Sequence, residues 1–348
     1  MENYIDMPSL DGISPEGLER IKDVFPQFSF DNFVNELTHA NNMFQPNRIF
    51  EFLTTVFVNE LYSAIKILTV IVGIVMLSSM LENLQNSFGK STYNANITTV
   101  ALIMGLAIKI FQQSSAYAIG ISEDLTTMMM SLLPVMMTLT AGGGTVSTGV
   151  ITNPILLYMC NIFSVLFNKV LIPLSVTYLA LSLADLISDT VELGKFRELI
   201  KKIYNLILGI IMTIFTGLLS VGSFAGAALD SVGARGAKFA LSNMVPFVGR
   251  SIAEAMNAVA SASVMLKNAV GITGIVVMLA LCIAPIIEIA AVILCIRASA
   301  AICEPVASKK SIQVLTAIGD SLSMINASVI SIAVMMVISV GIIVGIGG

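Results

Sequence analysis

Three polar side chains within long apolar runs have the residue types and positions that could do chemistry in this chain. Glu288 lies deep inside the apolar stretch 269–296, and Lys169 follows Asn168 near the middle of the stretch 155–183. Ionisable groups are costly in hydrocarbon and usually face a cavity, a partner or an opposite charge. Two interpretations remain open: a pore-lining or ion-coupling group, and a buried salt bridge or a charge that reaches the headgroups.

The other reactive residue types are too scattered to indicate an enzyme. The single histidine, His39, has no cysteine or carboxylate partners at ligand spacing, and no two of the four cysteines have C-x-x-C spacing. The chain has no G-x-x-x-x-G-K-[ST] phosphate loop. We therefore expect no enzymatic activity, no cofactor, no metal ion and no nucleic-acid partner.

The elements that would position these side chains are membrane helices. The 348 residues are 56% hydrophobic and only 11% charged, whereas soluble domains carry about 25% charged residues. Apolar runs of membrane-spanning length recur along the chain, and their length excludes the short alternating strands of a barrel. The sequence predicts an all-α, polytopic helical membrane protein in the lipid bilayer, with about 6–8 membrane segments.

Two of the expected segments are irregular. Residues 125–141 are short and end in Gly142, Gly143 and Gly144, which indicates a broken helix or a re-entrant loop, or else a flexible connection. Residues 155–183 are too long for one upright crossing and contain Pro173, so a tilted or kinked helix and two half-spans are both possible. The regular spans are expected at 61–81, 97–119, 203–225, 269–296 and 323–345.

Charge predicts the topology. Loops 185–202 and 297–320 carry lysines and arginines and should be cytoplasmic. Residues 1–60 hold ten acidic and three basic residues and should form an acidic extracytoplasmic segment before the membrane domain 61–348. They lack a signal-peptide pattern, so we expect targeting through the first apolar span or through a removed leader. An odd number of crossings must then precede residue 185, which favours a re-entrant 125–141.

Residues 217–271 are made mostly of Gly, Ala and Ser with single charges, and they predict an amphipathic helical hairpin held against the membrane bundle. Small residues let helix backbones approach closely within a bilayer. Charged residues here would face headgroups or contact other subunits. The candidate helix-packing or subunit-interface residues are Gly217, Gly222, Gly226, Gly233, Gly236, Arg235, Lys238, Arg250 and Glu254.

The run GLLSV…AGAALDSVGARGAKFALSNMVPFVG…SASVMLKNAVG, with the apolar segment after Gly271 and the Glu304–Pro305 turn, resembles the stage III sporulation protein AE family. The resemblance is strong over the C-terminal half and general in the first half. It implies a membrane subunit of a multiprotein channel or secretion-like complex in the mother-cell (outer forespore) membrane. The implied partners are other membrane subunits encoded with it and a forespore-side protein across the intermembrane space. Such a conduit would link mother cell and forespore and permit late forespore gene expression.

A stand-alone secondary transporter or permease is the alternative function. Broken helices and charges near the bilayer midplane are typical of transporters. The two halves of the sequence, however, show no convincing internal repeat.

Overall fold

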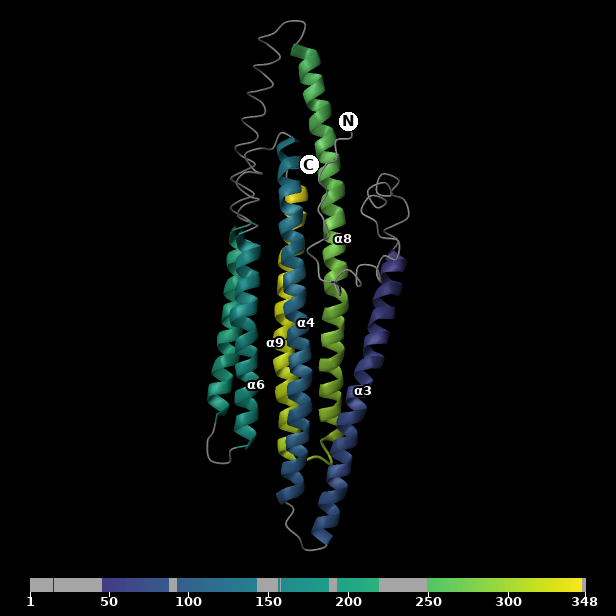
Figure 1. The fold of residues 1–348 in the computed structure, drawn as a ribbon, viewed down its shortest axis with the longest axis vertical. Helices are drawn as coiled ribbons and strands as arrows, with labels where there is room; N and C mark the ends of the chain where they lie inside the picture. The colour runs from purple at the N-terminus through teal and green to yellow at the C-terminus, as the bar shows by residue number, and fades with distance from the viewer. Residues whose placement is uncertain are drawn as a thin grey trace.

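A computed structural model describes residues 46–87, 93–142, 158–187, 193–218 and 249–345, with the isolated positions 15 and 156. These residues form an elongated helical bundle (Figure 1). Six described helices are long and apolar enough to cross a membrane, which confirms the predicted all-α polytopic class. Their candidate spans are Phe57–Leu77, Val100–Gly142, Tyr158–Leu186, Gly194–Leu218, Ala258–Cys303 and Lys309–Gly345.

The first two helices are longer than the sequence predicts. Helix α3 covers Pro46–Ser87, so the end of the acidic segment 1–60 belongs to the first spanning helix. Helix α4 covers Tyr93–Gly142 without interruption and contains Pro134. The expectation of a separate, re-entrant segment at 125–141 is wrong, because these residues continue the helix that begins at Tyr93. The other two glycines of the triplet lie outside the described residues.

For the stretch 155–183, which could have been one kinked helix or two half-spans, the structure shows one distorted helix. The helix Tyr158–Leu186 contains a π-helical segment η1, Phe167–Leu171, followed by α6, Ile172–Ile187. The Ile172 N–H donates to the Phe167 carbonyl, one residue further back than in an α-helix. The distortion directly precedes Pro173, which has no N–H to donate.

The C-terminal third is a pair of long helices. Helix α8 covers Gly249–Cys303 and α9 covers Lys309–Gly345. Between them, Ser308 begins α9 as an N-cap, because its hydroxyl accepts a hydrogen bond from the Ser311 N–H at 3.3 Å. The second arm of the predicted 217–271 hairpin is not a separate helix. In the structure, residues 249–271 form the first part of α8 and continue without a break into the following span. Its first arm, 219–248, lies outside the described residues.

Helices α8 and α9 form the centre of the bundle. Helix α8 packs against α3, α4 and α9, and α9 packs against α8, α4 and α6. Two glycines of α8 allow its neighbours to come close. A Cβ on Gly271 would overlap Val344 Cγ2 of α9, and a Cβ on Gly274 would lie 2.6 Å from Leu132 Cδ1 of α4. Small residues therefore pack helices closely here, as expected in a bilayer.

The helices alternate in direction along the chain. Figure 1 shows the ends of the helices next to the connections 88–92, 188–192 and 304–308 at the lower end of the bundle. The cation-rich loops lie at this end, so the charge rule predicts that it faces the cytoplasm. Among the described residues, three candidate spans come before the 185–202 loop, the third ending at Leu186, and this is the odd number that the rule requires.

Candidate functional site

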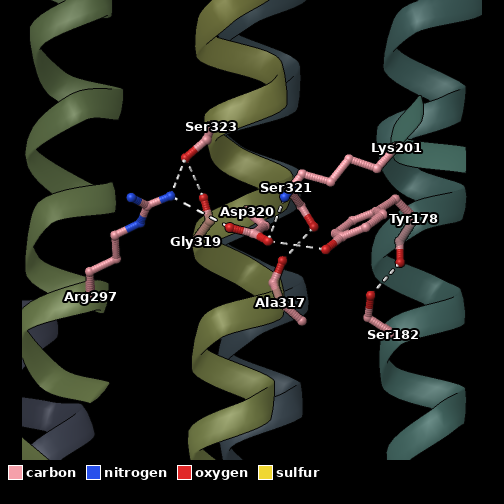
Figure 2. Close-up of polar contacts among 9 residues, drawn as sticks. All are labelled: Tyr178, Ser182, Lys201, Arg297, Ala317, Gly319, Asp320, Ser321 and Ser323. Carbon is pink, nitrogen blue, oxygen red and sulfur yellow. Dashed lines mark hydrogen bonds and ion pairs between the residues drawn. The ribbon is translucent and has the colours of Figure 1, made fainter. Parts of the chain in front are cut away.

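One carboxylate joins four helices near the lower end of the bundle (Figure 2). Asp320 of α9 accepts a 2.9 Å ion pair from Lys201 Nζ at its Oδ2 atom. Arg297 Nη2 lies 3.5 Å from its Oδ1 atom. The Tyr178 hydroxyl donates to Oδ2 at 3.2 Å. We call Tyr178, Lys201, Arg297 and Asp320 the Asp320 cluster.

Each member comes from a different helix, so the cluster exists only in the folded bundle. Arg297 reaches Asp320 along the surface of α9 and passes over Gly319, where an added Cβ would be in ordinary contact with Arg297 Cγ at 3.5 Å. Arg297 Nη2 also donates to Ser323 Oγ at 3.1 Å. The arginine side chain is thus oriented by two groups, spaced three residues apart on α9.

The cluster is partly hydrated and carries excess positive charge. The side chains of Lys201, Arg297 and Asp320 are 43%, 57% and 25% exposed. Two cations share one carboxylate, and Lys201 Nζ also lies 5.9 Å from the centre of the Tyr178 ring. Arg197 lies one turn before Lys201 and is close enough for its charge to act on the Tyr178 hydroxyl. The arrangement joins the ends of four helices around a site with a net positive charge.

A second polar contact continues the same helix pairing toward the membrane interior. Tyr204 lies three residues after Lys201 and is buried. Its hydroxyl donates to the Met324 carbonyl and is hydrogen-bonded to Ser328 Oγ. Because Asp320, Met324 and Ser328 repeat every four residues, they occupy one face of α9. Helix Gly194–Leu218 is therefore fixed in register along this face.

Glu288 is half-buried in α8, a helix that packs against α3. Its carboxyl group is near enough to that of Glu60 for the two to repel each other. One turn further along the same helix pair, Ala64 packs with Ala291 and Cys295. These small side chains allow α3 and α8 to approach closely, so the structure places two carboxyl groups, not one, within this part of the membrane domain.

Asn168 and Lys169 lie in η1, which contacts α4 and α9. Lys169 is exposed on the surface of the bundle. Asn168 Oδ1 is buried and has no hydrogen-bond partner among the described residues. Glu288 instead lies in α8, where its charge acts on Glu60 of α3. The structure therefore does not bring the three predicted intramembrane polar residues into one site.

The predicted interface residues are only partly described. Gly217 has no atom of the described residues within 4 Å of the position of an added Cβ. Arg250 and Glu254 belong to α8, but their side chains are not described. Gly222, Gly226, Gly233, Gly236, Arg235 and Lys238 lie outside the described residues. Their interface role stays a prediction.

Sequence reasoning misses the Asp320 cluster. It places Asp320 in a cytoplasmic loop, although this residue lies in α9 beside the apolar face of that helix. One signal is present: Asp320, Met324 and Ser328 share helical spacing with the apolar residues that follow. In the described parts of the chain, no group of three or more His, Cys, Asp or Glu side chains could hold a metal ion.

Comparison with known proteins matches most of this chain to one protein family. The family model described as Stage III sporulation protein AE matches residues 28–347. The chain is 26% identical over 315 residues to Stage III sporulation protein AE of Bacillus subtilis (strain 168), covering 90% of this chain and 79% of that relative. No solved structure matches the chain. A family match over residues 28–347 covers both halves of the bundle, and the chain therefore belongs to the stage III sporulation protein AE family.

Proposed function

We propose that this multi-pass membrane protein is a subunit of a multiprotein channel or secretion-like complex that links mother cell and forespore. It would reside in the mother-cell (outer forespore) membrane and support late forespore gene expression. Its partners would be other membrane subunits encoded with it and a forespore-side protein across the intermembrane space. We propose further that it acts without enzymatic chemistry of its own.

The observation that carries this proposal is the length of α8 relative to the bilayer. Helix α9 rises about 37 Å from Asp320 to Gly345 at 1.5 Å per residue, enough for a hydrocarbon core of about 30 Å. Gly271 of α8 packs beside Val344, near the end of α9. Residues 249–270 therefore continue about 33 Å beyond that level, and Figure 1 shows α8 rising past α9.

The projecting part of α8 has apolar side chains that nothing in the described chain covers. Val259 is 62% exposed and Met265 is 71% exposed. Helix α4 accompanies this part of α8 only up to Gly142, where a Cβ would lie 2.6 Å from Ser263 Oγ. Outside the hydrocarbon core, lipid tails cannot cover such side chains. Their exposure favours a subunit that meets other proteins on the extracytoplasmic side.

The test is cysteine cross-linking in sporulating cells. The native cysteines, Cys160, Cys282, Cys295 and Cys303, are buried and would first be replaced by Ser or Ala. Met265→Cys or Val259→Cys in this background should then cross-link to other subunits of the complex. Val259 and Met265 fall at the start of the 46-residue candidate span Ala258–Cys303, beyond the level of Gly271, whereas Leu206 lies inside the 25-residue span Gly194–Leu218. Leu206→Cys, at a position that is also 62% exposed, is therefore the matched control and should give no such product. Cross-linking from neither projecting position would contradict the proposal.

A stand-alone secondary transporter remains the second candidate, favoured by the Glu60–Glu288 pair and by the π-helical segment η1. Carboxyl groups within a membrane domain are typical of ion pathways, and π-helical segments often occur at functional sites. Reconstitution of the purified chain alone distinguishes the two. A transporter would move a solute unaided, whereas a subunit would need its partners.

A further inference from the structure

We propose that the Asp320 cluster binds the phosphate group of an anionic phospholipid from the cytoplasmic leaflet. The cluster lies where such a headgroup is found, carries the opposite charge and exposes the arginine that would bind it. This inference is independent of the channel role, because a transporter with the same bundle would have the same lipid site.

The charge of the cluster leaves one cation without a matching anion. Lys201 and Arg297 share Asp320, the one carboxylate within 4.0 Å of either in the described part of the chain. A phosphodiester carries one negative charge, so a single anionic lipid would neutralise the cluster. Arg197, close to the Tyr178 hydroxyl, adds further positive potential. Basic sites between membrane helices on the cytoplasmic side are known to bind anionic headgroups.

The position of the cluster selects a lipid over a soluble anion. No charged residue follows Asp320 in α9 up to Gly345. We therefore place its carboxylate at the level of the headgroups, where the uncharged stretch that can cover the hydrocarbon core begins. Tyr178 places an aromatic ring with a polar hydroxyl at the same level, as is common at membrane interfaces. Leu294, one turn from Arg297 toward the membrane interior, is 53% exposed and could contact the acyl chains.

Arg297 has the geometry to bind the phosphate. Its Nη2 atom is engaged by Asp320 and Ser323, and in Figure 2 the other terminal nitrogen points away from the carboxylate with no contact drawn to it. More than half of this side chain is exposed. A guanidinium presents several N–H donors in one plane and suits phosphate oxygens. Lys201 would add a point charge from the other side of Asp320.

The experiment measures thermal unfolding of the full, delipidated chain in neutral detergent with added short-chain lipids. Dihexanoyl phosphatidylglycerol should raise the unfolding temperature at lower concentration than dihexanoyl phosphatidylcholine. Arg297→Gln should reduce this preference about fivefold, the effect of one cation at a membrane surface. Arg297→Lys should restore most of it. Lys309→Gln, which removes one exposed cation at the same end outside the cluster, should leave the preference unchanged.

Each of the following results would overturn the proposal. The two lipids could raise the unfolding temperature of the wild-type chain at equal concentrations, a result that requires no variant. Inorganic phosphate at matched concentration could reproduce the whole effect, which would indicate a soluble anion instead of a lipid. Arg297→Gln could keep the full preference, or Lys309→Gln could lose as much of it as Arg297→Gln does.

Discussion

Replacing Asp320 with Asn tests whether the cluster holds the helices together. The change keeps the shape of the side chain and removes its charge. Exposed ion pairs contribute about 0.2–1 kcal/mol each. The Lys201 pair, at 2.9 Å with a carboxylate that is 25% exposed, belongs near the upper value. The Arg297 pair, at 3.5 Å with an arginine that is 57% exposed, belongs near the lower value.

The Tyr178 hydrogen bond adds to this loss. Hydrogen bonds to charged groups contribute about 1.5–3 kcal/mol, but the amide oxygen introduced by Asp320→Asn could still accept from the hydroxyl, so we assign about 1 kcal/mol to weakening the 3.2 Å contact. Together the three contacts give about 2 kcal/mol. For a chain of 348 residues, that corresponds to about 3 °C in the apparent unfolding temperature, because the entropy of unfolding grows with chain length.

The assay is thermal unfolding of wild-type and Asp320→Asn chains in the same detergent at low and high salt. The difference should shrink as salt screens the two ion pairs. Glu198→Gln removes an exposed acidic charge from the same end of the bundle and should change the unfolding temperature by less than about 1 °C. Equal unfolding of Asp320→Asn and wild type, or an equal loss in Glu198→Gln, would refute the reasoning.

Three further predictions concern the bundle. Tyr204→Phe should destabilise the chain by only about 1 kcal/mol in thermal unfolding, because the freed Ser328 hydroxyl can turn to a carbonyl of its own helix; a loss above about 3 kcal/mol would contradict this. Gly271→Val should cost about 2 kcal/mol or more through overpacking. Gly209→Val, with no described atom within 4 Å, should cost less than Gly271→Val in the same assay. Glu288→Gln should leave the protein level unchanged and lower expression of a late forespore reporter, whereas normal expression would argue for a purely structural carboxyl group.

The membrane helices could be predicted from hydropathy, but their boundaries could not. Residues 120–124 of α4 are polar enough to suggest a loop between two spans. In the structure Ser122 is buried and hydrogen-bonded to Ser164 at 3.1 Å, and Asp124 is buried as well. Hydropathy treats polar residues as exposed to water, yet here they lie between helices, so α4 continues through them.

The candidate site was less predictable, because its members lie far apart in the sequence. Glu288 stands out by its depth within an apolar run, a property of one segment alone. Its neighbour Glu60 and the members of the Asp320 cluster depend on which helices are adjacent, and helix order cannot be derived from hydropathy. The predicted interface glycines do not include Gly271 and Gly274, which together with Gly142 are the glycines that the described chain packs most closely.

The most direct test of the subunit function is the size of the assembly extracted from sporulating cells in mild detergent. The tagged wild-type chain should migrate with partner proteins in a complex much larger than one chain in its micelle. Met265→Asp should shift it toward the single chain, because a charge would then occupy the exposed apolar part of α8. A wild-type chain that is found alone and moves a solute unaided after reconstitution would contradict this account.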